Sequence, residues 1–549
     1  MRKLVKRQVH CRMWTALQLL LLLGGAAEAQ ISSVGLSAVR SQHFADENLI
    51  FYVPGVADTF ASALAAGDFN GDGADDLATG VPSHDNLGAG HPDSGIVVVR
   101  YGASRTGLRS GLATTVLSQV TGGEPDPAED GDAFGWALAS CDFNGDGFDD
   151  LAVGVRLEDV GSAVDAGAVE IYYGGPSGLA SVAEQFLTQN SNGIPGTAET
   201  NDQFGMALGC GDLDFDGFGD LAIGAPTETF EHSGGDIVGA GTVALIYGGP
   251  GGLTGARTHS FNEDALLPSD HPACGELFGF ALVFGDFNSD LYDDLVIGAP
   301  GERIDGSCAP GTGVGGFAYI QGGAGDGVAI QLMQTSSAWG EPPEIGDHVG
   351  YTLAAGDFDG DLNCDLAVGV PFEDFSIPVI PDAGEVAVLY FEGGFPARHQ
   401  IWYEEEVYGA GTSEGVDHFG LTLAAADFDR DGFSDLAIGH PGEDVIATDD
   451  GALTVVMGSP DGLIVSRIRL FVEGNAGLPG PVTQSLRTFA AALAAGDFDG
   501  DGAADLAIGA PLENSATLFD TGAEVVLYGS LFCDGFEAGT LSSWPGEVP

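Results

Sequence analysis

The chain has 549 residues, of which 44% are hydrophobic, so it can bury a large core. It is strongly acidic, because 81 Asp and Glu face only 17 Lys and Arg, which gives a formal charge of −64. This charge makes nucleic acid and anionic membrane surfaces poor partners and cations good ones. A general acidic surface bias, as in salt-adapted exported proteins, is a compatible second explanation.

The first 29 residues have the pattern of a secretory signal peptide. Basic residues up to Arg12 precede a leucine-rich apolar stretch at Thr15–Gly25, and Ala27-Glu28-Ala29 fits a cleavage site. A retained membrane anchor is the alternative, but the apolar stretch is short and no second one follows. We therefore expect a secreted or cell-surface protein that begins at Gln30 and has no transmembrane segment. This mature chain would hold 12 Arg, no Lys and 80 acidic residues.

One acidic segment recurs seven times along the chain. It begins at Asp68 with the sequence Asp-Phe-Asn-Gly-Asp-Gly-Ala-Asp-Asp, and it returns at Asp142, Asp212, Asp286, Asp357, Asp427 and Asp497. The intervals are 74, 70, 74, 71, 70 and 70 residues. A repeat of such constant spacing indicates one structural unit used seven times.

Each repeat contains four short segments of strand character. In the third repeat, small and apolar residues at 204–211 precede the acidic segment, and Leu221–Pro226 follows it. An alternating segment, Gly241–Tyr247, and a Gly-rich turn then lead into a more polar fourth segment. Four strands in each of seven units predict an all-β fold, a seven-bladed β-propeller over residues 30–530.

The two ends of the repeat region predict how the ring closes. The last repeat stops after its third strand, Ala523–Tyr528, and an unmatched strand near Leu49–Val53 precedes the first acidic segment. We expect this N-terminal strand to complete the last blade and remove the exposed sheet edges. An open solenoid would not need this exchange. Residues 531–549 are expected to form a short C-terminal tail.

The acidic segment has the spacing of a cation-binding loop, D-x-[DN]-x-D-x-x-x-D. Positions 1, 3, 5 and 9 offer side-chain oxygens and position 7 a backbone carbonyl, a set that favours Ca²⁺ over Mg²⁺ or zinc. A metal-free Asx-rich turn is the alternative, although clustered carboxylates repel one another without a counter-ion. The candidate ligands are Asp68, Asn70, Asp72, Ala74, Asp76, Asp142, Asn144, Asp146, Phe148, Asp150, Asp212, Asp214, Asp216, Phe218, Asp220, Asp286, Asn288, Asp290, Tyr292, Asp294, Asp357, Asp359, Asp361, Asn363, Asp365, Asp427, Asp429, Asp431, Phe433, Asp435, Asp497, Asp499, Asp501, Ala503 and Asp505.

An EF-hand or dockerin loop begins in the same way but requires an acidic residue at position 12. Six of the seven loops have Val or Ile at that position and the first has Thr79. The EF-hand interpretation is therefore excluded.

The motifs that flank the loop carry a family resemblance. Phe204-Gly205 before the loop and Gly224–Pro226 after it are similar to the FG-GAP repeat of integrin α-subunit head domains, here of a bacterial secreted type. The similarity covers all seven units, roughly residues 45–530. The resemblance implies a seven-bladed propeller with Ca²⁺ in hairpin loops on the lower face. It also implies that ligands and partner subunits use the opposite face.

Several positions depart from this pattern. Loops four and five carry Leu291 and Leu362 where the others have Gly at position 6, so up to seven calcium sites are expected, with these two weaker or in a different turn. Val349-Gly350 and two Phe-Ala pairs, at Phe60 and Phe489, replace Phe-Gly in three units. No segment is similar to the integrin leg domains.

A second acidic position follows sixteen residues after each loop begins. It could form a charged ring at the channel mouth, or it could cap backbone amides in a turn, which we favour. The residues are His84, Glu158, Glu228, Glu302, Glu373, Glu443 and Glu513. The six cysteines of the mature chain are scattered, without a zinc-type C-x-x-C pair, and Cys274 with Cys308 is a plausible disulfide.

We find no catalytic constellation in the sequence. The expected function is a secreted, calcium-binding scaffold for adhesion or protein interaction, with an unknown extracellular protein or glycan as ligand. The alternative is a polysaccharide-processing lyase or hydrolase on the same propeller. A mature chain without Lys makes a lyase base or a substrate clamp harder to build.

Overall fold

The structure is a computed structural model, and it describes residues 37–45, 58–86, 91–109, 114–120, 127–230, 237–263, 274–303, 313–323, 330–334, 344–376, 379–404, 407, 415–444, 449–473, 478, 488–514 and 520–529. The expected signal peptide, the expected C-terminal tail and Cys308 lie outside these residues. Among the helices within these ranges, none is long and apolar enough to cross a membrane.

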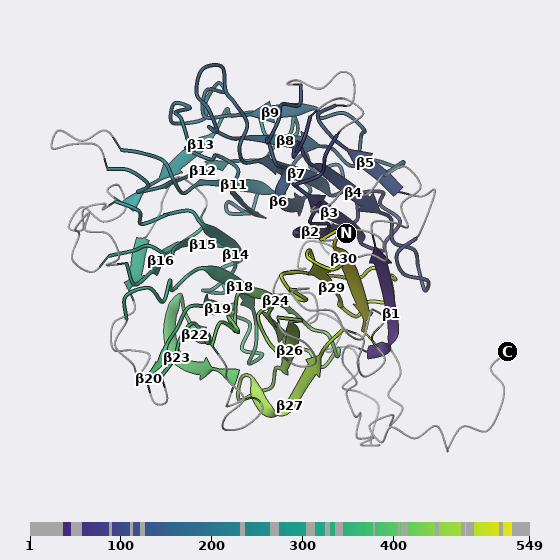
Figure 1. The fold of residues 1–549 in the computed structure, drawn as a ribbon, viewed down its shortest axis with the longest axis vertical. Helices are drawn as coiled ribbons and strands as arrows, with labels where there is room; N and C mark the ends of the chain where they lie inside the picture. Colours follow the sequence, from purple (N-terminus) through teal and green to yellow (C-terminus); the bar gives the residue numbers. More distant parts are fainter. Residues whose placement is uncertain are drawn as a thin grey trace.

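The chain folds into seven four-stranded antiparallel sheets arranged around a central axis, as Figure 1 shows. This confirms the predicted all-β, seven-bladed propeller. Blades one to three contain β2 (Ala63–Gly67), β3 (Asp76–Val81), β4 (Ile96–Arg100), β5 (Thr114–Leu117), β6 (Phe134–Cys141), β7 (Asp150–Val155), β8 (Ala168–Tyr172), β9 (Gln185–Leu187), β10 (Ala207–Gly211), β11 (Asp220–Ala225), β12 (Thr242–Ile246) and β13 (Thr258–Phe261).

Blades four to six continue the same order, and a small hairpin, β20 with β21, interrupts blade five. Their strands are β14 (Ala281–Gly285), β15 (Asp294–Ala299), β16 (Gly316–Ile320), β17 (Ile330–Gln334), β18 (Thr352–Gly356), β19 (Asp365–Val370), β20 (Phe375–Ser376), β21 (Val379–Ile380), β22 (Glu385–Glu392), β23 (Phe395–Trp402), β24 (Thr422–Ala426), β25 (Asp435–His440), β26 (Ala452–Met457) and β27 (Ile464–Phe471). Blade seven contains β28 (Ala492–Gly496), β29 (Asp505–Ala510), β30 (Ala523–Tyr528) and β1 (Ser37–Ala45).

Burial differs between the strands of a blade, and residue type follows it. The first strand of each blade contacts the first strands of its neighbours, including β2 with β28, which closes the ring. The second and third strands, such as β11 and β12, are buried throughout. They are rich in Val, Ile and Leu because both of their faces pack against other blades. The outer strand β27 is largely half-buried or exposed, and its sequence is mixed.

The Phe-Gly and Gly-Ala-Pro motifs are packing elements between blades. The phenylalanine is buried, as at Phe134. A glycine near the end of each second strand, such as Gly80, lies close to the backbone of the next blade. A Cβ at Gly80 would be only 2.1 Å from the Gly135 carbonyl oxygen. The same approach recurs between Gly154 and Gly205. The repeat therefore requires glycine because neighbouring backbones touch at this point.

The N-terminal strand closes the ring, but it is not the predicted one. β1 pairs antiparallel with β30, so the last blade is completed by Ser37–Ala45. The predicted strand near Leu49–Val53 is therefore wrong as the closing strand, and these residues lie outside the described part of the chain. An outer strand needs few apolar residues. In β1, Phe44 packs into the core and Gln42 accepts a hydrogen bond from the Tyr528 hydroxyl.

A buried ion pair joins the last blade to the first. Arg100 on β4 donates to Glu524 on β30, and the Thr79 hydroxyl donates to the same carboxylate at 2.6 Å. All three residues are buried, and the Arg100 guanidinium lies 4.6 Å from the centre of the Phe44 ring of the closing strand. The seam of the ring is therefore held by a polar contact that reaches three strands.

A disulfide links the adjacent blades two and three. Cys141, at the end of β6, bonds to Cys210 on β10, with Cα atoms 6.4 Å apart and a sequence separation of 69. The sequence did not predict this pairing. Closing a loop of this length restricts the unfolded chain and stabilises the fold by about 4 kcal/mol in the chain-entropy account.

Candidate metal-binding loops

The seven acidic loops occupy equivalent places in the fold. Each connects the first strand of a blade to the second, as the loop between β10 and β11 does, and all seven lie at the same end of the blades. All the predicted ligand residues fall in these hairpin loops. Position 9 is the first residue of the second strand, as in Asp220.

Backbone amides orient the carboxylates at positions 1, 3 and 5. In the third loop, Asp212 accepts hydrogen bonds from the amides of Asp216 and Gly217, both at 3.0 Å. Asp214 accepts from the Asp216 amide, and Asp216 accepts from the Phe218 amide. The other six loops contain the same bonds. The loop conformation thus gathers its own acidic side chains.

Position 9 has a second role that the sequence did not indicate. Asp220 is fully buried, and it accepts hydrogen bonds from the Leu213 amide at 2.9 Å and the Gly248 amide at 3.0 Å. This carboxylate ties the loop to the end of the third strand in every blade. Burial, together with repulsion from Asp214 and Asp212, raises its pKa to about 8 despite these donors. A nearby cation would favour the charged form.

The loops bring together a donor set that suits a hard cation. Oxygen atoms of Asp212, Asp214 and Asp220 lie within 4.8 Å of one another, as do those of Asp357, Asp359 and Asp361. Calcium takes six to eight oxygen ligands at about 2.3–2.6 Å, from carboxylates, carbonyls and water. Burial, together with repulsion from neighbouring carboxylates, raises the pKa of Asp220 to about 8 and that of Asp357 to about 6, and a cation bound between them would offset both effects.

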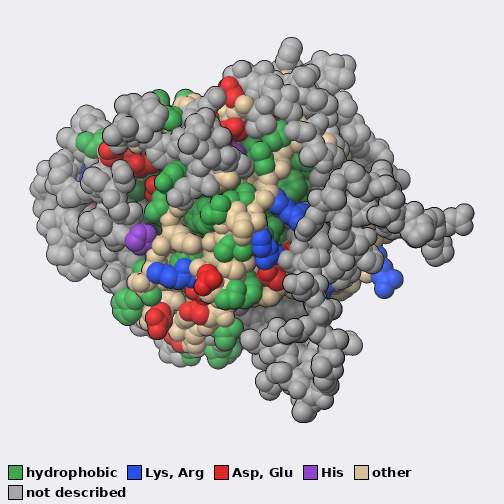
Figure 2. Space-filling view, turned by 90° about the horizontal axis from the view of Figure 1, so that it is seen from below, with side chains coloured by type: hydrophobic (Ala, Val, Ile, Leu, Met, Phe, Trp, Pro, Cys, Tyr) green, Lys and Arg blue, Asp and Glu red, His purple; other side chains and the backbone are tan. Residues whose placement is uncertain are grey.

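Arginines near the outer strands balance three of the loops that carry four carboxylates. Loops three, five, six and seven have Asp at position 3, and in the first three of these an arginine of the same blade pairs with it. The pairs are Arg257 with Asp214, Arg398 with Asp359, and Arg467 with Asp429. Loops one, two and four have Asn at this position, and in loop one Arg109 lies 3.7 Å from Asp72. An Asp with its arginine has the same net charge as an Asn, so loops two to six present a similar charge to an ion. Figure 2 views the ring from its edge and shows Lys or Arg side chains next to Asp or Glu side chains on this outer surface.

The two leucine-containing loops keep the common turn. Leu291 and Leu362 have φ of 82° and 76°, in the left-handed region, and their amides bond to Asp286 and Asp357 as the glycine amides do elsewhere. The expectation of a different turn is therefore wrong for both loops. Position 4 is also left-handed throughout, including Phe215 and Arg430, which the sequence analysis missed.

Neighbouring loops touch and form a belt on this face. In six of the seven loops the position 8 amide donates to the position 1 carbonyl of the preceding loop, as Asp293 does to Asp212 at 3.2 Å. The same bond joins loop one back to loop seven, from Asp75 to Asp497 at 2.9 Å. Between loops six and seven, the Arg430 side chain donates to the Asp501 carbonyl at 3.1 Å. Rings at position 7 also cover position 4 of the preceding loop, as Tyr292 covers Phe215 with centroids 5.9 Å apart. The loops are therefore mechanically coupled.

The chain is similar to known proteins over this repeat. The FG-GAP repeat matches residues 60–99, 134–172, 204–246, 278–320, 349–389, 419–456 and 489–527. The chain is 31% identical over 245 residues to integrin alpha-PS2 of Drosophila melanogaster and 30% identical over 249 residues to integrin alpha-5 of Xenopus laevis. These alignments cover 43% and 44% of the chain but only 15% and 20% of the relatives. Phosphatidylinositol-glycan-specific phospholipase D of Bos taurus is 31% identical over 166 residues, 30% of this chain and 18% of that protein. Seven matched repeats that coincide with seven blades establish that the chain belongs to the FG-GAP repeat family.

Proposed function

We propose that the seven loops bind Ca²⁺ and that the protein is an exported propeller whose other face binds an extracellular protein or glycan. The main support is the donor set of the loops, because backbone amides hold the side chains at positions 1, 3 and 5 together and the buried carboxylate at position 9 completes a set of oxygen ligands. Loops four and five would bind calcium more weakly, because their leucines hold a strained conformation.

The face opposite the loops carries apolar and aromatic side chains around the axis. The first strand of each blade runs toward its calcium loop, so residues at its start lie at the other end, near the centre. Trp136, Met206, Phe280, Tyr351 and Leu421 occupy this position in blades two to six, and we call them the central crescent. The Phe280 and Tyr351 rings lie 4.8 Å apart between blades, and Trp136 is 38% exposed beneath Arg156. Aromatic rings that remain accessible suit protein or sugar ligands.

The relatives give independent support for a binding role. Two of the similar proteins are integrin alpha chains, which supports a ligand-binding role. The similar phospholipase D gives a weaker reason to consider an enzyme, since the alignment covers 18% of that protein. We therefore favour a binding scaffold that acts outside the cell.

Calcium binding predicts a large change in stability. The folded loops bind the ion and the unfolded chain hardly does, so each filled site stabilises the fold by mass action. Elemental analysis of purified protein should find several Ca²⁺ per chain, and chelation should lower the Tm substantially. Protein without bound metal and with an unchanged melting curve would contradict the proposal.

Ligand binding is tested on a glycan array and against extracellular protein extracts, with and without Ca²⁺. The variant Trp136→Ala should lose binding while its Tm stays close to that of the parent, because the ring is partly exposed. Phe395→Ala, which removes a 62% exposed aromatic ring on the outer strand β23, is the matched control and should bind normally. If the protein cleaves a polysaccharide and chelation stops this cleavage, the scaffold hypothesis is wrong and the enzymatic alternative is favoured.

A further inference from the structure

A second set of polar side chains recurs where blades meet, on the face opposite the calcium loops. One member lies two residues beyond the last paired position of a blade's outer strand, as Gln119 does after Leu117. The other is the acidic residue sixteen positions after the next loop begins, such as Glu158. The structure buries or half-buries these acidic residues between blades, so they do not form the exposed ring considered from sequence. We call each such pair an interblade pair.

Three interblade pairs show how the buried charge is compensated. Gln119 donates to Glu158 at 2.8 Å between blades one and two, and Gln189 donates to Glu228 between blades two and three. Between blades six and seven both members are glutamates, Glu473 and Glu513, and an imidazole joins them.

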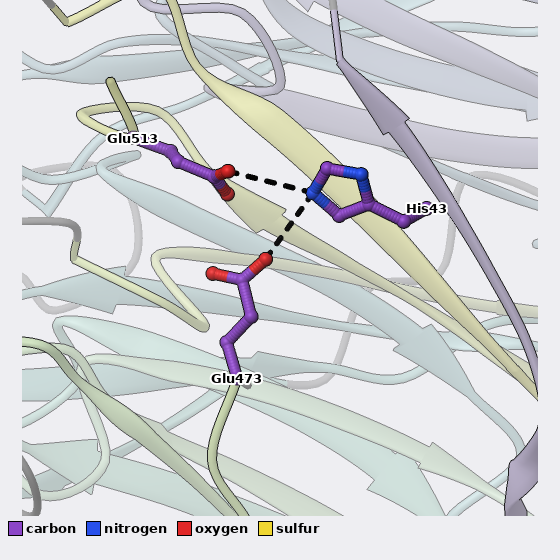
Figure 3. A group of neighbouring side chains, drawn as sticks. All are labelled: His43, Glu473 and Glu513. Carbon is purple, nitrogen blue, oxygen red and sulfur yellow. Dashed lines mark ion pairs between the residues drawn. The ribbon is translucent and has the colours of Figure 1, made fainter. Parts of the chain in front are cut away.

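Figure 3 shows His43 Nε2 facing both carboxylates of that third pair, 3.2 Å from Glu473 and 3.5 Å from Glu513. Burial alone would lower the pKa of His43, but its bonds to the two glutamates raise it to about 10. The imidazole is therefore the cation of this pair.

The pair between blades five and six has two glutamates, Glu404 and Glu443, with His440 beside them. His440 replaces the Ala or Val that the other repeats have at this point. It is fully buried. Its Nε2 lies 3.0 Å from the Thr454 hydroxyl, and its Nδ1 lies 4.0 Å from Glu443.

One carboxylate oxygen of Glu404 is buried. The residue is 2% exposed, and its Oε2 has no hydrogen-bond partner among the residues that the structure describes. Its ionisable neighbours Glu443 and Asp417 are both acidic. Ligand atoms of Glu404, His440 and Glu443 lie within 4.8 Å of one another. Two atoms bound to one tetrahedral zinc ion at about 2.1 Å lie about 3.4 Å apart, so the glutamate side chains have to rotate inward by about 1 Å to bind one ion.

We propose that Glu404, His440 and Glu443 bind one divalent transition-metal ion of the Zn²⁺ type between blades five and six. One imidazole nitrogen with two carboxylates suits such an ion, whereas Ca²⁺ prefers oxygen ligands alone. The tautomer with Nε2–H donated to Thr454 leaves Nδ1 as the ligand, which is the usual outer-shell arrangement of a metal-bound histidine. This site is separate from the calcium loops and does not depend on them.

The test is a calorimetric Zn²⁺ titration of the full-length secreted protein in excess Ca²⁺, which keeps the acidic loops filled. We expect one Zn²⁺ per chain, and Co²⁺ in the same site should give visible absorption bands of nitrogen and oxygen coordination. Glu404→Gln should weaken Zn²⁺ binding at least tenfold and remove the Co²⁺ bands. This variant should fold, because Gln119 and Gln189 occupy the same position in other blades. His440→Gln should have the same effect on both readouts.

The control is Glu473→Gln, which makes the same change at the pair already bridged by His43 and should leave Zn²⁺ binding unchanged. Absence of Zn²⁺ binding, with a folded protein, would mean that a proton shared by the carboxylates occupies the place of the metal, and it would overturn the proposal. Zn²⁺ binding that survives in both Glu404→Gln and His440→Gln would do so as well.

Discussion

The two leucines at position 6 are the least favourable residues of the calcium belt. Leu291 and Leu362 adopt left-handed φ values and are 45% and 44% exposed, so their side chains contribute little packing. A β-carbon in this conformation costs about 1–2 kcal/mol in the folded state. Glycine removes this cost but makes the unfolded chain more flexible, which offsets part of the gain in stability. We expect Leu291→Gly and Leu362→Gly each to raise the free energy of unfolding by about 0.5–1 kcal/mol in Ca²⁺. Urea denaturation measures this change.

The control for that prediction is Gly217→Leu in the third loop, which should lower stability by a similar amount. Destabilisation by either leucine-to-glycine change would contradict the prediction. It would mean that the leucine side chain makes a contact worth more than its backbone strain.

A sequence pattern predicts the role of a loop residue well when the residue interacts only with residues close to it in the chain. Asp212, Asp214 and Asp216 were predicted because they act within one turn. The partner Arg257 was not, because it lies more than forty residues away and is placed by the pairing of β12 with β13. The double use of Asp220 was missed for the same reason, since its second donor belongs to the end of the third strand.

At the scale of elements, the repeat predicts the structural features that every blade shares, but not those found at only one place in the ring. The seven units and their four strands were predicted from periodicity. The closing strand β1 was not, because a single outer strand pairs along only one edge and its polar sequence resembles that of a loop. The Cys141–Cys210 bond and the Arg100–Glu524 pair were also missed, since each exists at one boundary between blades.

The buried pair at the seam is expected to matter for ring closure. Arg100→Met would leave Glu524 buried with Thr79 as a donor but without its ion-pair partner, and Glu524→Leu would leave the buried arginine without its carboxylate. Loss of one member of a buried ion pair costs about 3–5 kcal/mol, whereas replacing both by apolar residues is often nearly neutral. Urea denaturation should therefore show a double variant that is more stable than either single variant. Additive losses would show that the pair is not a coupled unit.

At the scale of the whole molecule, the belt concentrates negative charge that the fold alone does not compensate. Burial and mutual repulsion raise the pKa of Asp150 to about 8 and that of Asp365 and Asp505 to about 9. Unfolded aspartates titrate near 3.9, roughly four to five units lower. Between these values the folded protein without metal holds more protons than the unfolded chain.

This difference sets the sign of the pH dependence. The free energy of unfolding falls with rising pH wherever the folded state binds more protons, so metal-free protein should lose stability steadily from about pH 4 to about pH 9. Calcium displaces those protons, and its stabilising effect should therefore grow over the same range. Urea denaturation at pH 5.5 and 8.5, after passage over a chelating resin and then with Ca²⁺ restored, measures both slopes. Because the loops contact one another from Asp75 to Asp497, the loss should appear as one cooperative transition of the ring. Metal-free protein that is more stable at pH 8.5 than at pH 5.5 would show that the belt carboxylates are not the groups that control stability.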